Sequence, residues 1–177
     1  MSVLGPSPMK TIIVLAMHGA PPLDFPEEEM REYFELQGRE HRHPFPSGHS
    51  ARFKELETRM RNYPRSESND PFWKGSRDLA EALEKACRLP VLLGFNEFCA
   101  PGMEEAFDRA AQSGAQKIIV VTPMMTRGGE HAESDIPASI DRARGRYPGL
   151  TFIYAWPFPA EDVASFLAQR IKSLSGL

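Results

Sequence analysis

The sequence predicts an α/β fold, a three-layer sandwich with a four-stranded parallel sheet between helices. Four short runs of apolar, largely β-branched residues are separated by segments with helical periodicity. The runs are continuously apolar rather than alternating, which is typical of strands buried on both faces of a parallel sheet. Strands that alternate with helices in this way form βαβ crossovers. At 177 residues, the chain is predicted to be a single domain spanning residues 1–177.

The elements follow one another in a regular order along most of the chain. The predicted strands cover residues 10–17, 90–95, 116–122 and 150–155. The predicted helices cover residues 78–89, 102–113, 136–147 and 160–174. In the last of these helices, Val163, Phe166, Leu167 and Ile171 recur at the spacing of one helix face. That stripe predicts a helix packed on the sheet.

Residues 23–70 interrupt this order. They hold an acidic amphipathic segment at 26–36, a polar loop at 38–50 and a second helical segment at 52–62. Many of the sixteen prolines fall in or near this region. We interpret it as a helical insertion after the first strand, with two short helices that cover one mouth of the sheet.

Composition excludes several classes of partner and compartment. The net charge of −3 gives no reason to expect a nucleic-acid or anionic-membrane partner. The apolar run at 11–17 is far too short to span a bilayer. Two cysteines, Cys87 and Cys99, are too few for a disulfide scaffold and fit a reducing compartment. We therefore expect a cytoplasmic protein.

Three polar side chains each follow a different predicted strand. His18 ends the first strand, Glu97 follows the second and His131 follows the third. In an open parallel sheet, ligands bind beyond the carboxyl ends of the strands. Two imidazoles and a carboxylate can bind a borderline divalent metal or accept protons at neutral pH. Each residue taken alone has a structural alternative, such as a hydrogen-bonded loop histidine or a solvated glutamate, but their coincidence favours a shared site.

The loop before His131 offers a second kind of site. Backbone N–H groups of Gly128 and Gly129 can face an anion at the start of the following helix, although paired glycines are also compatible with an ordinary loop. Ser134 or Asp135 is predicted to be the N-cap of that helix.

Two other groups of potential metal ligands have plainer explanations. Cys99 could bind such metals as a thiolate, but a small buried residue is the favoured interpretation. The histidines of the 38–50 loop, His41, His43 and His49, could form a metal-delivery patch, although loop histidines are more often solvated.

Three blocks of sequence carry a resemblance to a known family. "HGAPP" follows the first strand, "GFNEFCAP" precedes a helix, and "GAQKIIVVTPMMTRGGEHAESDIPASIDRAR" holds the third strand and the loop to His131. Together they resemble the CbiX-type chelatases, the short class II tetrapyrrole chelatases that act on sirohydrochlorin. The resemblance covers residues 10–22 and about 71–170, and the third block is its most specific part. His18, Glu97 and His131 match the two histidines and the glutamate of the family pattern.

The resemblance implies a lyase-type reaction in which Co²⁺, Fe²⁺ or Ni²⁺ enters sirohydrochlorin or a related tetrapyrrole. The metal is then a substrate, and no organic cofactor is implied. His18 and His131 would hold the metal or accept pyrrole protons, with Glu97 beside them. Gly128, Gly129 and Arg127 would receive the carboxylates of the macrocycle. A homodimer that joins two lobes around one cleft is also implied.

Two departures from the family pattern keep alternatives open. Ala20 stands where the family has serine, and Glu130 is inserted between the glycine pair and His131. A non-catalytic protein that binds tetrapyrrole or metal is one alternative. A histidine-type phosphatase is less favoured, because Met17 precedes the histidine where that chemistry needs an arginine.

Overall fold

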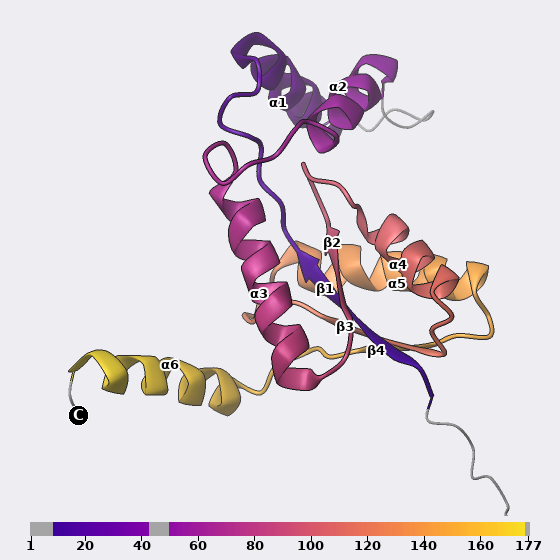
Figure 1. The fold of residues 1–177 in the computed structure, drawn as a ribbon. Coiled ribbons are helices and arrows are strands. Elements are labelled where there is room, and N and C mark those ends of the chain that lie inside the picture. The colour runs from indigo at the N-terminus through magenta and orange to yellow at the C-terminus, as the bar shows by residue number, and fades with distance from the viewer. Residues whose placement is uncertain (1–8, 43–49, 176–177) are drawn as a thin grey trace, which may run out of the picture.

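A four-stranded parallel sheet forms the centre of the computed structural model, which describes residues 9–42 and 50–175 (Figure 1). Its strands are β1 (Thr11–Met17), β2 (Val91–Phe95), β3 (Lys117–Val121) and β4 (Thr151–Tyr154), in the order β2-β1-β3-β4. Every strand pair is parallel. The predicted α/β class and parallel sheet are confirmed, and each strand ends within one residue of its predicted limit.

Helices lie on both faces of the sheet. They are α3 (Pro71–Cys87), α4 (Met103–Gln112) and α5 (Ile136–Arg146). In this order, β2 lies on one side of β1, whereas β3 and β4 lie on the other side. The β1–β2 crossover therefore runs in the opposite direction to the β2–β3 and β3–β4 crossovers. Right-handed crossovers therefore put α3 on one face and α4 with α5 on the other, as Figure 1 shows.

Alternate residues of each strand pack toward opposite faces. On the face of α4 and α5, residues such as Val14, Ile118 and Phe152 form the main core with Phe107 and Ile140. On the face of α3, a second cluster contains Leu15, Met17, Ala80, Phe95 and Cys99.

Helix α3 begins earlier than predicted, at Pro71 instead of residue 78. The Asp70 carboxylate accepts a hydrogen bond from the backbone N–H of Trp73, and Pro71 occupies the first turn. An aspartate followed by proline is an ordinary helix start, because the cap satisfies a free N–H and proline has none to satisfy.

The insertion forms two helices, α1 (Glu27–Arg42) and α2 (Ala51–Arg61), as expected. They stand beyond the carboxyl ends of β1 and β2 in Figure 1. Helix α1 continues to Arg42, so the predicted loop from residue 38 was wrong over its first residues, where no proline interrupts the helix. Of the predicted histidine patch, His43 and His49 lie outside the described residues. The insertion has its own apolar cluster, which includes Tyr33, Phe53, Leu56 and Met60 and is joined by Phe98 from the Glu97 loop.

The last helix, α6 (Ala160–Ser175), extends away from the sheet (Figure 1). Its apolar stripe is exposed: Phe166 is 58% and Ile171 is 60% accessible. Helix α3 covers β1 and β2 only, so Ile153 of β4 is also 44% exposed on that face. The expected packing of α6 on the sheet is therefore not made within one chain. Among the described residues, no helix is long and apolar enough to cross a membrane.

Candidate metal centre

The strand order places the residues after β1 and β3 at the same crevice. From β1 the chain moves outward to β2, whereas from β3 it moves outward to β4 on the opposite side. Diverging connections leave an opening between the carboxyl ends of the two neighbouring strands, and ligands bind at such switch points. His18 follows β1 and His131 follows the loop after β3, so sheet topology brings both imidazoles to this opening.

The loops that carry His18 and Glu97 interlock through their backbones. The N–H of Glu97 donates to the carbonyl of His18 at 2.8 Å, and the N–H of Asn96 donates to the carbonyl of Met17 at 2.9 Å. Gly19 has φ +101°, and a β-carbon at this position would lie 1.9 Å from the Glu97 carbonyl oxygen. Only glycine fits this close approach of two backbones.

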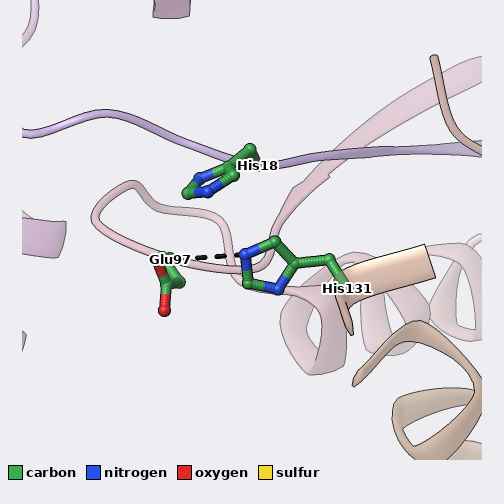
Figure 2. A group of neighbouring side chains, drawn as sticks. All are labelled: His18, Glu97 and His131. Atoms are coloured by element: carbon green, nitrogen blue, oxygen red, sulfur yellow. Dashed lines mark ion pairs between the residues drawn. The ribbon is translucent and has the colours of Figure 1, made fainter. Parts of the chain in front are cut away.

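The three predicted ligands converge, as Figure 2 shows. One ligand atom from each of His18, Glu97 and His131 lies within 4.8 Å of the others. The two imidazole rings meet edge to face with their centroids 4.5 Å apart. His131 Nε2 lies 4.0 Å from a Glu97 carboxylate oxygen. All three side chains are half-buried, which leaves the group accessible to a ligand.

Hydrogen bonds fix which nitrogen of each histidine is free. The Nδ1–H of His18 donates to the carbonyl of Gly19 at 3.0 Å. His131 Nδ1 contacts the Asp135 carboxylate at 2.5 Å and donates to it. A histidine that donates from Nδ1 keeps its lone pair on Nε2. Both Nε2 atoms are therefore available to a metal or a proton.

Asp135 takes the N-cap position of α5, one of the two residues predicted for it, but its side chain has a different role. The chain already turns helically from His131, in a single π-helical turn over His131–Asp135, and Asp135 makes no side-chain cap for α5. Its carboxylate instead holds His131, one turn back along the helix. Sequence reasoning missed this contact, although a histidine and an aspartate at i and i+4 face the same side of a helix.

A π-helical turn follows Glu130, the residue that the resemblance marks as an insertion. The backbone N–H of Ile136 donates to the carbonyl of His131, so this turn holds one residue more than an α-helical turn. Such turns occur mostly as single turns within α-helices, frequently at functional sites. Glu130 is exposed, and it is not part of the three-residue cluster. His131, directly after Glu130, still faces Glu97.

Phe98 and Cys99 complete the surroundings of Glu97. The ring of Phe98 stacks on His18 at 6.1 Å, with 12° between the planes. Cys99 is fully buried, and burial raises the pKa of its thiol to about 11. Its sulfur faces the carbonyl of Ala20 and the carboxylate of Asp70, away from the three ligands. Cys99 is therefore the small buried residue that the sequence indicated.

The loop before His131 is open to solvent. Arg127, Gly128 and Gly129 are all exposed, and Gly128 adopts φ +86°. Arg127 lines a cavity of about 430 Å³ formed with the start of α6, including Phe158, Val163 and Leu167. The three ligands do not line this cavity. The predicted carboxylate-binding group thus lies on the loop that leads to His131.

Comparison with known proteins identifies relatives of this chain. The CbiX family model matches residues 68–174, a range that contains Glu97 and His131 and begins after His18. A sirohydrochlorin ferrochelatase from Priestia megaterium is 29% identical over 105 residues, which are 56% of this chain and 39% of that protein. A sirohydrochlorin cobaltochelatase from Sulfurisphaera tokodaii is 31% identical over 85 residues, 48% of this chain and 67% of that protein.

A solved structure matches nearly the whole fold. A protein described as a cobalamin biosynthesis CbiX protein, from Marinobacter aquaeolei VT8, is 17% identical with a TM-score of 0.50, and the match covers 93% of this chain and 96% of that one. The chain spans only 39% and 26% of the length of the two Priestia megaterium chelatases that it matches.

Proposed function

The chain belongs to the CbiX family, and we propose that it inserts a divalent metal, Co²⁺, Fe²⁺ or Ni²⁺, into sirohydrochlorin or a related tetrapyrrole. The observation that carries this proposal is the convergence of His18, Glu97 and His131, whose ligand atoms lie within 4.8 Å of one another. We propose that residues 1–177 act as one chelatase domain, with the insertion at about 23–70 as part of it.

The donor set suits a metal that must be released as well as bound. Two neutral imidazoles and one carboxylate bind Co²⁺, Fe²⁺ and Ni²⁺, whereas thiolates would hold these ions more tightly. Three protein ligands also leave coordination positions for the pyrrole nitrogens. Each metal that enters the macrocycle displaces two N–H protons. The Glu97 carboxylate and a histidine Nε2 released by the metal are the groups that can accept them.

The carboxylates of the macrocycle require a separate binding region. The exposed Arg127 guanidinium, together with the N–H groups of Gly128 and Gly129, can hold them at the mouth of the centre. This assignment predicts that Arg127→Ala raises the KM for the tetrapyrrole while Co²⁺ binding to the free protein stays unchanged.

The proposed enzyme is a homodimer, and the exposed face of α6 supports this. The chain carries both an exposed apolar helix stripe, at Phe166 and Leu167, and an exposed apolar strand position, at Ile153 of β4. Apolar surface of this kind is stabilised by removal from water. A second copy supplies the complementary surface for each. Phe166→Asp should therefore give a monomer by sedimentation, whereas Ser165→Asp, one residue away on α6, should leave the dimer intact.

Two unpaired thiols support a cytoplasmic location. Cys87 is exposed and Cys99 is buried, so the two cannot form a disulfide without rearrangement of the fold. An exposed free thiol is typical of a reducing compartment.

Anaerobic incubation with sirohydrochlorin and each metal, followed by absorbance, tests the proposed reaction. The wild-type protein should accelerate insertion of at least one of the three metals over the spontaneous rate, and His131→Ala should abolish the acceleration. Tetrapyrrole binding without acceleration would instead support a carrier. Absence of both binding and acceleration would refute the proposed function.

A further inference from the structure

We propose that two arginines of the insertion, Arg61 and Arg65, position the loops that carry Glu97 and His18. They thereby set the affinity of the centre for metal. This inference rests on the proposed function, because it assumes that these side chains bind the metal substrate. Both arginines precede residue 68, where the family match begins, so the match assigns them no role.

Hydrogen bonds from the insertion reach the Glu97 loop on both sides of Glu97. Arg61 donates from its guanidinium to the carbonyls of Asn96 at 2.8 Å and Cys99 at 3.2 Å. The N–H of Ala100 donates back to the carbonyl of Arg61 at 3.0 Å. Arg65 donates to the carbonyl of Phe98 at 2.5 Å. The loop residues next to Glu97 are therefore held by the insertion, while the Glu97 carboxylate faces His131.

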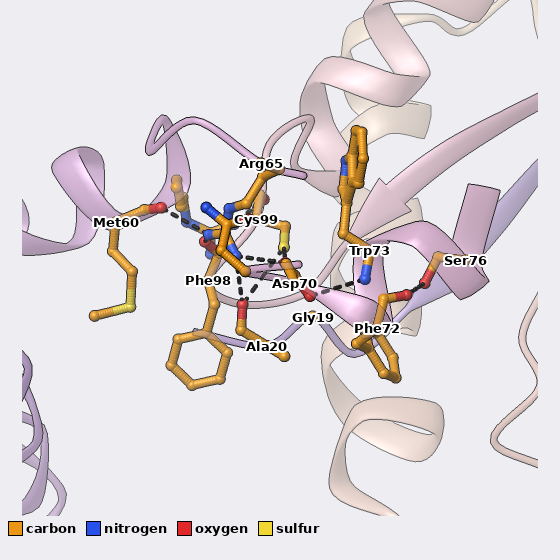
Figure 3. A network of polar contacts seen from close by, with 12 residues as sticks. Gly19, Ala20, Met60, Arg65, Asp70, Phe72, Trp73, Ser76, Phe98 and Cys99 are labelled. Carbon is orange, nitrogen blue, oxygen red and sulfur yellow. Dashed lines mark hydrogen bonds and ion pairs between the residues drawn. The ribbon is translucent and has the colours of Figure 1, made fainter. Parts of the chain in front are cut away.

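Arg65 also ties the loop that follows His18 to the same point (Figure 3). It donates to the carbonyl of Ala20 at 2.7 Å and to that of Met60 at 2.8 Å. Its charge is balanced by Asp70 at 2.5 Å, in an ion pair whose side chains are only 6% and 1% exposed. A buried, hydrogen-bonded pair of this kind leaves its members little freedom to move. One guanidinium thus fixes two ligand-bearing loops relative to each other.

The backbone of Phe98 shows why such a restraint is needed. Phe98 has φ +58°, a conformation that a non-glycine residue adopts only when its surroundings impose it. Arg65 holds its carbonyl, and its ring packs between His18 and the aromatic side chains of α1, Tyr33 and Phe34. Without these contacts, the loop is expected to relax and carry Glu97 away from the histidines.

A double-mutant cycle on Co²⁺ affinity tests this role. Arg61 is the better target because its side chain is 24% exposed, so Arg61→Ala should fold. We expect Arg61→Ala to weaken Co²⁺ binding about 10- to 100-fold, the usual effect of removing a group that orients a ligand. In a Glu97→Gln background, the same change should have little further effect, because Arg61 acts through Glu97.

Matched variants separate positioning from general stability. Arg59 lies on the same helix and pairs with Glu29 at the surface, without contacting the Glu97 loop, so Arg59→Ala should bind Co²⁺ as the wild type does. Arg61→Lys keeps the charge but has one terminal nitrogen in place of the two that reach the carbonyls of Cys99 and Asn96, and should lie between wild type and Arg61→Ala. Thermal unfolding of all variants identifies any loss due to misfolding.

Two results would overturn the inference. The first is a Co²⁺ affinity of Arg61→Ala equal to that of the wild type. The second is an equal loss of Co²⁺ affinity on Arg61→Ala in the wild-type and Glu97→Gln backgrounds. Either result leaves the proposed function standing, provided that Glu97→Gln weakens Co²⁺ binding in the wild type. If Glu97→Gln has no effect on Co²⁺ binding, the metal centre and the role of the arginines both fail.

Discussion

Replacing Gly19 with alanine should disable the proposed metal centre while the sheet stays folded. A β-carbon at Gly19 would lie 1.9 Å from the Glu97 carbonyl oxygen, and real β-carbons essentially never come closer than 3.0 Å to such an atom. One backbone must therefore move by at least 3.0 − 1.9 = 1.1 Å. Because the two loops carry His18 and Glu97, this movement separates ligands that now lie within 4.8 Å.

The energetic cost has two parts. Alanine at a left-handed φ costs about 1–2 kcal/mol, and overpacking in a closed space costs about 1–3 kcal/mol. A loss of about 2–5 kcal/mol lies within the total stability of about 5–15 kcal/mol of an ordinary domain. A displacement of about 1 Å at a reacting group can lower the rate about 100-fold. We therefore expect a folded protein with a strongly reduced rate of metal insertion.

Gly75→Ala provides the matched control. Gly75 lies in α3, and a β-carbon there meets no atom within 4 Å. Alanine in an exposed helix stabilises by about 0.5–1 kcal/mol relative to glycine. Cobalt insertion and thermal unfolding are measured for both variants. A wild-type insertion rate in Gly19→Ala, with unfolding unchanged, would show that the two loops are not interlocked as described.

Three further changes test other parts of the site. Asp135→Asn should weaken Co²⁺ binding about 10- to 100-fold in a direct titration, because the ring of His131 loses the carboxylate that orients it; unchanged affinity would contradict that role. Glu130→Ala should leave Co²⁺ affinity unchanged in the same titration, since Glu130 is exposed and outside the cluster; a clear loss would mean that Glu130 binds the metal. At about pH 8, a thiol reagent should modify Cys87 but not Cys99 in the folded protein, because burial raises the pKa of Cys99 to about 11 and keeps it protonated below that pH. Mass spectrometry counts the labels, and equal labelling of both cysteines without denaturant would contradict the burial.

Sequence patterns predicted the strands closely because a buried parallel strand has few alternatives. The run at 10–17 is apolar at nearly every position, and β1 fills all but its first residue. The convergence of His18, Glu97 and His131 was predictable for a related reason: parallel strands end at one edge of the sheet. Those inferences depend only on chain direction and hydrophobicity.

Contacts between side chains and backbone carbonyls were not predictable in the same way. Arg61 and Arg65 donate to the backbone carbonyls of residues 96, 98 and 99. Because every residue has a backbone carbonyl, the sequence does not indicate which carbonyls accept these hydrogen bonds. Asp135 fits an N-cap and a histidine partner equally well until the backbone at His131 is known. The stripe on α6 is equally ambiguous, because a helix face has the same periodicity whether its partner is in the same chain or another.

The guanidinium of Arg65 also bears on the order in which the molecule folds. Arg65 lies 45 residues after Ala20 and 33 residues before Phe98, and its guanidinium donates to the carbonyls of both. The pairing of β1 with β2 closes a longer loop, from Ile13 to Val91, and brings Ala20 and Phe98 near each other before Arg65 joins them. We expect the sheet to form first and the Glu97 loop to reach its final shape only when the insertion docks. In refolding from denaturant, the far-ultraviolet signal of helices and strands should return before the ability to bind Co²⁺. Recovery of both in one phase would show that the insertion and the sheet fold as a unit.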